Sequence, residues 1–130
     1  MMTITVDKLS IKLCRENPND IFVFGDNLIG EGKGGQAIIR DEPNAFGIPT
    51  KRLPSMRPNA FFGDRRDEAS SLFALLNILA ELKNTNGNGR IVFPSAGLGT
   101  GLAKMEEKSP KLYKAMNEFI KENFGVEFKP

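Results

Sequence analysis

The sequence predicts an α/β protein in which buried strands of a layered sheet alternate with helices. Short apolar runs at residues 21–24 and 91–93 are bounded by turn residues, as is typical of strands buried on both faces of a parallel sheet. Between these runs, residues 67–83 place leucines at helical spacing. With 130 residues, 40% of them hydrophobic, the chain fits one compact domain over residues 1–130.

The strands follow from β-branched and apolar runs that prolines, asparagines and glycines separate. Pro49 lies inside one such run and indicates a strand end or an edge position, because proline cannot donate a ladder hydrogen bond. The predicted strands are residues 3–6, 21–24, 45–50 and 91–93, with 126–128 as an edge strand.

The helices differ in how their ends are marked. Asp7 is a candidate N-cap for the first, and Pro43 ends the second because it disfavours helical backbone at the residue before it. Ser109 and Pro110 form an N-cap and first-turn pair for the last helix, which Gly125 ends. The predicted helices are residues 9–14, 36–41, 67–83 and 110–124.

Composition restricts the chemistry and the compartment. The net charge is +2, and the basic residues are spread along the chain without the polybasic block that indicates a nucleic-acid groove. Cys14 has no disulfide partner and the N-terminus lacks the apolar core of a signal peptide, so we expect a cytoplasmic protein without membrane contact. The absence of histidine removes the usual general base and most zinc chemistry, and we expect neither a metal nor a cofactor. Any catalysis must use carboxylates, lysines, backbone groups or water.

Two glycine-rich loops follow predicted strands. FGDNLIGEGKGGQAIIR has five glycines before its helix begins, and AGLGTGL follows residues 91–93. In α/β sheets, ligands bind at the carboxyl ends of strands, and a glycine loop that enters a helix offers backbone N–H groups to a phosphate. We therefore predict that the two loops clamp a diphosphate. The alternative is that both are ordinary turns.

Four motifs, FVFGDN, GGQAIIR, IPTK and IVFPSAGLGTGL, occur in the order found in macrodomains and together resemble that ADP-ribose-binding α/β family. The resemblance covers roughly residues 21–120 and implies a three-layer α/β/α sandwich with a mixed sheet. Within the family the chain looks most like small phage and bacterial proteins with an F-V-F-G-x-N opening. It also looks like the branch of terminal ADP-ribose glycohydrolase and the DNA-acting antitoxin macrodomains. The implied partner is ADP-ribose or a derived nucleotide, free or carried on a macromolecule.

The resemblance and the loop argument together give the candidate ligand-binding residues. They lie at the end of the second predicted strand, in the two glycine loops and at the end of the strand before the second loop. They are Asn27, Gly32, Gly34, Gly35, Gln36, Pro94, Gly97, Gly99, Thr100 and Gly101.

In the glycohydrolase branch a lysine after a strand ending I-T-K is catalytic, and Lys51 of IPTK matches it. A desolvated amine with a lowered pKa can attack the anomeric carbon of a ribose, or its ring-opened aldehyde, without histidine. The alternative is a solvated charge. The aspartate of the branch's second glycine loop is replaced by Gly101, so Asp26 and Asp64 are candidate catalytic substitutes.

Structural roles compete with these assignments. The Asp-Asn pair at residues 26–27 could form an Asx-turn. Phe61 and Phe62 could flank a base or close the core, and Asp64 or Asp67 could cap the helix that follows.

Three functions follow from these residues. The first is an ADP-ribosyl glycohydrolase that uses Lys51. A non-catalytic nucleotide-binding module or sponge is the second, favoured by Gly101 in place of the aspartate. A small interaction protein with structural glycine loops is the third. The leaving group, the oligomeric state and the biological partner are left open.

Overall fold

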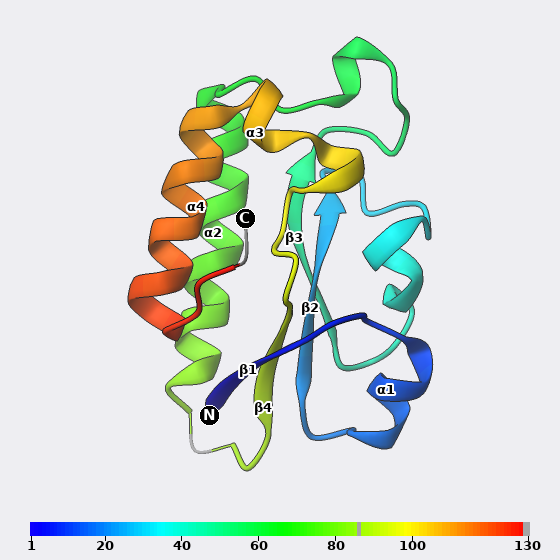
Figure 1. Ribbon diagram of the computed structural model, residues 1–130, viewed down its shortest axis with the longest axis vertical. Helices are drawn as coiled ribbons and strands as arrows, with labels where there is room; N and C mark the ends of the chain where they lie inside the picture. The colour runs from blue at the N-terminus through cyan, green and yellow to red at the C-terminus, as the bar shows by residue number, and fades with distance from the viewer. Residues whose placement is uncertain (86, 129–130) are drawn as a thin grey trace.

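The computed structural model describes residues 1–85 and 87–128, and strands alternate with helices in it as predicted (Figure 1). The strands are β1 (Met2–Val6), β2 (Ile21–Asn27), β3 (Ala45–Lys51) and β4 (Arg90–Pro94). The α-helices are α1 (Ile11–Glu16), α2 (Arg66–Lys83), α3 (Met105–Lys108) and α4 (Pro110–Phe124). Three short 3₁₀ helices are η1 (Gly35–Ile39), η2 (Pro58–Ala60) and η3 (Gly101–Ala103).

The four strands form one sheet in the order β1-β4-β2-β3, and each neighbouring pair is parallel. The mixed sheet implied by the family resemblance is therefore wrong for the described residues. An isolated antiparallel bridge joins Lys51 to Phe61 just beyond β3. Because parallel strands end at the same edge of a sheet, the loops after β2, β3 and β4 meet there.

The edge strand predicted at residues 126–128 is also wrong. Gly125 ends α4 in the left-handed region, with φ 70°, and the chain then turns back over the sheet without pairing. Val126 is buried, and the Phe128 ring packs edge-on against Phe93 at 5.9 Å between centroids. These apolar side chains are explained by packing against the core rather than by a strand.

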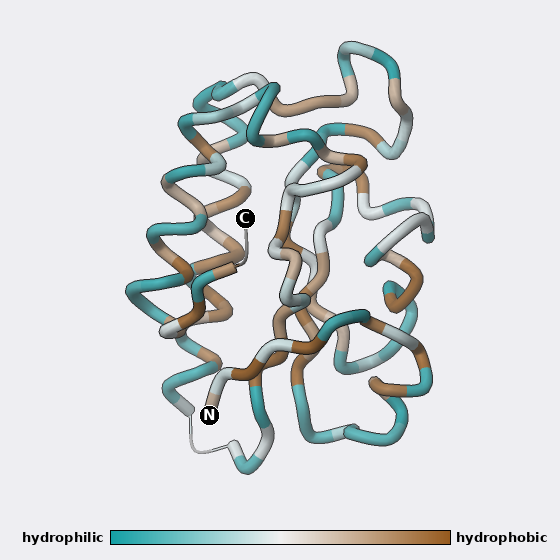
Figure 2. Tube along the Cα trace, viewed as in Figure 1, coloured by the Kyte–Doolittle hydropathy of each residue, from teal (hydrophilic) through white to brown (hydrophobic). Residues whose placement is uncertain are grey.

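Helices cover both faces of the sheet, with α2 and α4 on one side and α1 and η1 on the other (Figure 1). Neighbouring residues of β2 point to opposite faces, so Val23 joins the α2 and α4 core while Phe22 and Phe24 join the α1 and η1 core. In β4, Phe93 and Val92 divide in the same way. Figure 2 shows brown stretches in the middle of the sheet, and residues 22–24 of β2 and 91–93 of β4 are buried on both faces, which explains their unbroken apolar runs.

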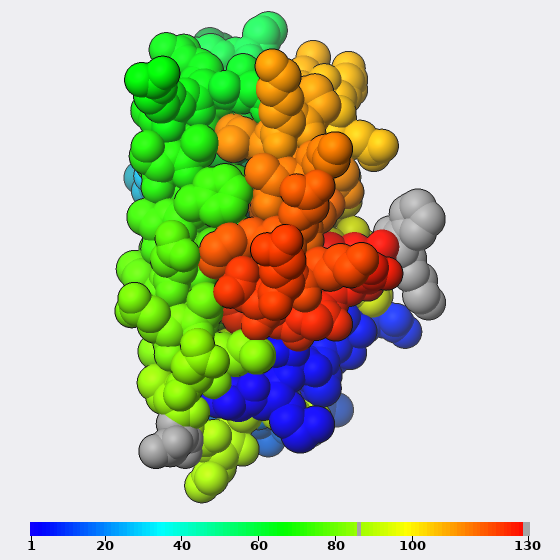
Figure 3. All heavy atoms as spheres, turned by 90° about the vertical axis from the view of Figure 1, so that its left-hand side faces the viewer, coloured from blue at the N-terminus to red at the C-terminus, as the bar shows by residue number. Residues whose placement is uncertain are grey.

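Helices α2 and α4 lie side by side and form the outer surface of one face (Figure 3). Their buried sides hold Leu72, Leu76 and Leu79 of α2 and Met116 and Ile120 of α4. The helical spacing of the apolar residues therefore predicted both the helices and the face that each buries.

Ser109 and Pro110 take the predicted N-cap and first-turn positions of α4, but the side-chain caps of α1 and α4 differ from the predicted ones. Helix α1 is capped by Ser10 rather than Asp7, because the Ser10 hydroxyl accepts from the backbone N–H of Leu13 at 3.0 Å. The Ser109 side chain does not cap α4, since it donates to the carbonyl of Met105. The backbone N–H of Leu112 instead donates to the Asp64 carboxylate at 2.8 Å.

Asp64 thus caps a helix, as the structural alternative predicted, but it caps α4. The helix that follows Asp64 in the sequence is α2. At the start of α2, the Glu68 carboxylate accepts from the backbone N–H groups of Gly63 and Arg65, each at 2.8 Å. Arg52 pairs with the buried Glu68, and this contact ties the end of β3 to the first turn of α2. The second predicted helix is the 3₁₀ helix η1. No helix within residues 1–85 and 87–128 is long and apolar enough to cross a bilayer.

Candidate functional site

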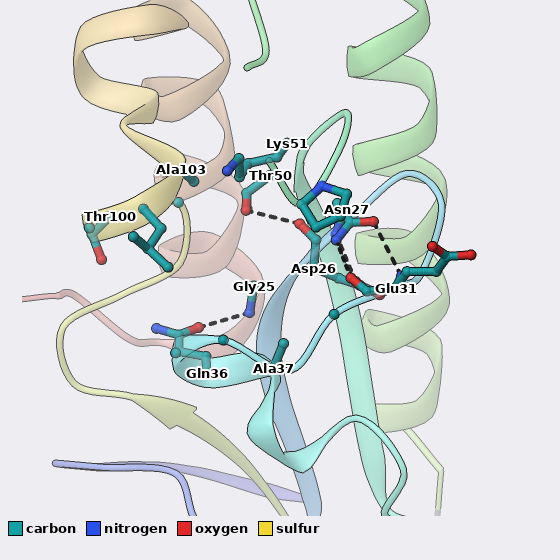
Figure 4. Close-up of a pocket in the computed structure, with 17 residues that line it drawn as sticks. Gly25, Asp26, Asn27, Glu31, Gln36, Ala37, Thr50, Lys51, Thr100 and Ala103 are labelled. Carbon is teal, nitrogen blue, oxygen red and sulfur yellow. Dashed lines mark hydrogen bonds between the residues drawn. The ribbon is translucent and has the colours of Figure 1, made fainter. Parts of the chain in front are cut away.

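A cavity of about 290 Å³ opens at the carboxyl ends of β2 and β3 (Figure 4). It is lined by these strand ends, by the first glycine loop with η1, and by the second glycine loop with η3. The predicted site residues that line it are Asp26, Asn27, Gly32, Gly34, Gly35, Gln36, Lys51, Gly99, Thr100 and Gly101.

Asp64, Pro94 and Gly97 lie outside the lining of this cavity. Asp64 is engaged at the start of α4, and Pro94 pairs with Val6 of β1 at the end of β4. Gly97 faces the C-terminal segment, because a Cβ there would lie 3.1 Å from the Phe128 ring. The first residues after β4 therefore serve packing, and the second loop reaches the cavity only from Gly99 onward.

Asn27 organises the first loop. Its Oδ1 accepts from the backbone N–H groups of Ile29 and Glu31 at 3.2 and 3.4 Å, and its Nδ2 donates to the carbonyl of Glu31 at 2.7 Å. This is the Asx-turn that the alternative interpretation predicted. The amide lies at the cavity, but these hydrogen bonds hold its own loop.

Asp26 forms a half-buried ion pair beneath the first loop. Arg40 donates to Oδ1 of Asp26 at 2.6 Å, and its guanidinium lies 5.4 Å from the centroid of the Phe24 ring. Arg40 also donates to the carbonyls of Gly32 and Glu31 at 2.7 and 3.1 Å. Asp26 is thus part of the loop scaffold and is not a carboxylate free to act as a base.

Gln36 joins the two loops. Its side-chain oxygen accepts from the backbone N–H of Gly25 at 2.8 Å, and its side-chain nitrogen donates to the carbonyl of Gly97 at 2.9 Å. One amide therefore sets the spacing between the end of β2 and the segment after β4. We expect Gln36 to shape the cavity rather than to exchange these bonds for a ligand.

Sequence reasoning missed the residues at the floor of the cavity. A Cβ at Gly25 would lie 3.3 Å from Gln36 Oε1, 3.4 Å from Thr50 Oγ1 and 3.8 Å from the Gly99 nitrogen, so the missing side chain keeps the floor open. Thr50 donates to the carbonyl of Asp26 at 3.2 Å. The usable signal was their position near the carboxyl ends of two strands. Leu102, in η3, also lines the cavity, but no pattern in the sequence marked it.

Backbone N–H groups from both loops are available at the cavity. Those of Gly34 and Gly99 make no hydrogen bond to another described residue, and the Gly99 nitrogen faces the floor at Gly25. The Thr100 hydroxyl donates to the carbonyl of Ala96 at 3.5 Å, which is a weak contact. Two loops with free donors on opposite sides of one cavity suit an anion with several oxygen atoms.

Lys51 is the cation of the cavity wall, and only 7% of its surface is exposed. Its amine donates to the carbonyl of Ser55 at 2.7 Å and lies 3.6 Å from the Met56 sulfur. Burial, together with the positive charge of Lys104, lowers the pKa of the Lys51 amine. The alternative of a solvated charge is therefore wrong. In the described residues, no cluster of acids, cysteines or histidines suits a metal ion.

The two phenylalanines have different roles. Phe62 is buried in the core between the sheet and the helices. Phe61 is half-buried, and the amines of Lys51, Lys104 and Lys108 surround its ring. The core-closing alternative is therefore correct for Phe62 alone.

The chain belongs to the family of unknown function DUF7831, which it matches over residues 4–119. No curated protein and no solved structure matches it. The region matched to the family contains the whole cavity lining, including both glycine loops and Lys51.

Proposed function

We propose that this member of a family of unknown function binds ADP-ribose or a related nucleotide in the cavity, with the diphosphate between the two glycine loops. The observation that carries the proposal is the pair of unbonded N–H groups, Gly34 and Gly99, on loops that border one cavity. In this proposal the sheet with helices on both faces is a macrodomain-like three-layer α/β/α sandwich whose strands are all parallel.

The cavity dimensions support a ligand that is only partly enclosed. About 290 Å³ is near the lower end of the range for small-molecule pockets, roughly 300–1,000 Å³. The diphosphate and one ribose would occupy the cavity, and the base would lie at its rim. There, the exposed side chain of Leu102 offers apolar surface.

Calorimetry with ADP-ribose, NAD and AMP tests binding, and Gly34→Leu is the informative variant. Gly34 has an ordinary backbone, with φ −77°, and a Cβ there would meet only Leu102 at 3.9 Å. The backbone angles and the open space at this Cβ favour a side chain in the folded protein, and we expect a bound ligand to collide with leucine there. We expect at least a tenfold loss of ADP-ribose affinity with an unchanged melting temperature.

Gly63→Ala is the matched control, because a Cβ at Gly63 meets nothing within 4 Å and Gly63 lies outside the cavity. It should bind ADP-ribose as the wild type does. Equal affinity in Gly34→Leu would exclude the proposed placement of the ligand. Absence of binding by the wild type to all three nucleotides would favour a small interaction protein.

Lys51 supports a second proposal, hydrolysis of an ADP-ribosyl bond. The deprotonated amine would attack the anomeric carbon while the bond from that carbon to the leaving group breaks. The leaving group would depart with the electron pair of this bond and take up a proton. Water would then cleave the ribosyl–lysine adduct and restore the amine. Arg40 engages Asp26 and Asp64 caps α4, so the carboxylate left to orient this water is Glu31, which lines the cavity.

Turnover assays with ADP-ribosylated protein, nucleic acid and nucleotide distinguish an enzyme from a sponge. Lys51→Ala and Lys51→Arg should both lose at least about a thousandfold in turnover, since arginine stays protonated and forms no adduct. The ribosyl–lysine adduct can open its ribose ring to a Schiff base, so borohydride added during turnover should reduce that imine and leave a ligand-derived mass on the peptide that contains Lys51. Tight binding of ADP-ribose with no turnover and no trapped mass would establish the sponge.

A further inference from the structure

Three lysine amines converge on one aromatic ring beside the cavity. The Nζ atoms of Lys51, Lys104 and Lys108 lie 5.0, 5.8 and 5.6 Å from the centroid of the Phe61 ring. Lys51 ends β3, whereas the other two lysines flank and end α3, so the fold assembles this cluster from distant segments. The attraction of one ring for a cation at an exposed site is weak, and it does not cancel the mutual repulsion of three charges.

Acidic side chains balance this charge only in part. Glu107 lies 3.8 Å from the Lys108 amine, with both side chains substantially exposed. Within the described residues, Lys51 and Lys104 form no ion pair with a carboxylate. The Lys51 amine has three N–H donors, and the contacts with Ser55 and Met56 use two of them.

The backbone beneath the cluster is strained. Lys104 has left-handed backbone angles, φ 48° and ψ 37°, which are unfavourable for a residue with a side chain. Glycine or asparagine would relieve this strain. A lysine in such a conformation, next to two other cations, supports a use for its charge.

We propose that Lys51, Lys104 and Lys108 form a second anion site, which binds a phosphate group outside the diphosphate held by the glycine loops. A phosphate group has enough strong acceptor oxygens to bind three separate donors at once. A single carboxylate has only two oxygens, in one plane, and suits three donors less well. The group is a phosphomonoester of a small nucleotide or a phosphodiester of a single strand. This site shares Lys51 with the cavity but does not depend on nucleotide binding there.

The direct test is a titration of the folded protein, with ¹³C-labelled lysine, by inorganic phosphate in NMR. The Hε–Cε signals of Lys51, Lys104 and Lys108 should shift together and reach saturation at one dissociation constant. Lys114, an exposed lysine of α4, is the internal control and should shift little. Equal and unsaturated shifts of all four lysines would overturn the proposal, since they would report only general screening.

Two variants sharpen the test. Lys104→Asn removes the charge with a residue that tolerates the left-handed backbone, and Lys108→Gln removes the other exposed charge. Each should weaken phosphate binding about fivefold, and the matched variant Lys114→Gln should not change it. Thermal melts verify that each variant folds. Unchanged phosphate affinity in folded Lys104→Asn would overturn the site.

Two further probes identify the source of the phosphate. If binding of adenosine 3′,5′-bisphosphate depends on Lys104, the site serves small nucleotides. If binding of a short oligothymidylate depends on it, with a salt slope reduced by about 0.7, the site serves a strand. If binding of neither probe depends on Lys104, the proposal is overturned. The phosphate titration of Gly34→Leu should match that of the wild type, which separates this site from the glycine loops.

Discussion

The two glycine loops that border the cavity are held in place by different means. Hydrogen bonds from side chains hold the first, where Asn27 and Arg40 bind the backbone of residues 29–32. In the second loop Gln36 binds Gly97, but from Gly99 onward packing holds the chain, since Gly99 lies directly against the buried side chain of Met105. Hydrogen bonds to backbone keep a loop in place without filling the space in front of it, whereas packing fills that space.

The two loops therefore contain glycine for different reasons, one set by the fold and the other, in our proposal, by a ligand. In the second loop the fold itself requires Gly99, because its φ is 75° and a Cβ would collide with Met105. In the first loop, Gly34 has an ordinary φ and open space toward Leu102, so the fold does not require it. A glycine that the fold does not need, at the wall of a cavity, favours close approach by a ligand.

The largest effect that this comparison predicts is on stability, from Gly99→Ala. The new methyl group would collide with Met105, which is fully buried and held by the hydrogen bond from its N–H to the Gly99 carbonyl at 2.9 Å. Overpacking and the left-handed backbone together should lower the free energy of unfolding by about 2–4 kcal/mol. Urea denaturation measures this loss.

Gly101→Ala is the control for the backbone contribution. Its φ is also positive, 57°, but a Cβ there meets nothing within 4 Å. It should lose only about 1 kcal/mol. Equal losses in the two variants would mean that packing does not hold the second loop.

A smaller effect is expected from Arg40→Lys in the first loop. Lysine keeps the charge near Asp26 but cannot reach both that carboxylate and the Gly32 carbonyl, which lie 2.6 and 2.7 Å from the arginine. We expect a loss of about 1–2 kcal/mol in the free energy of unfolding. ADP-ribose affinity, measured by calorimetry, should also fall because the loop loosens.

The exposed pair of Lys33 with Asp41 provides the comparison for this variant. Lys33→Met should change stability by less than about 0.5 kcal/mol and leave affinity unchanged. If Arg40→Lys behaves in the same way, side-chain hydrogen bonds do not hold the first loop.

Much of the fold was predictable because its signals are local. Residues 21–24 and 91–93 are apolar on both faces, and the leucines of residues 67–83 repeat at the helical period, so the strands, the longest helix and its buried side were predicted from short windows. The position of both glycine loops at strand ends followed from that alternation. Residues 126–128 are the exception, since Val126 and Phe128 pack against the core while the segment pairs with no strand.

The connections within the site were not predictable, because they join residues far apart in sequence. Asp64 caps a helix that begins 46 residues later, as its hydrogen bond to Leu112 shows, and Gln36 bonds to Gly97 across 61 residues. No spacing rule connects such pairs. The lysines around Phe61 have the same origin, since two come from α3 and its N-cap and one from β3.

The smallest expected effect concerns Lys51, which lines the cavity between the two loops. Burial first, and then the Lys104 charge, lowers its pKa in the folded protein below the ordinary value of 10.5. At a pH between the lowered folded-state pKa and 10.5, the unfolded chain binds the proton that the folded chain has lost. The free energy of unfolding of the wild type should therefore rise with pH across that window. Below the folded-state pKa the cost of the buried charge is fully present. Lys51→Met lacks this titration, so the stability of the wild type relative to the variant should increase as the pH rises toward 10.5.

Urea denaturation of both proteins from pH 7 upward measures that change, with Lys114→Met as the control for loss of an exposed lysine. Lys104→Asn should reduce the change, because it removes the second of the two causes of the lowered pKa. Parallel stability curves for the wild type and Lys51→Met would show that the amine titrates as it does in the unfolded chain. The cavity wall would then offer no activated nucleophile near neutral pH, and binding between the two loops would remain the function to test.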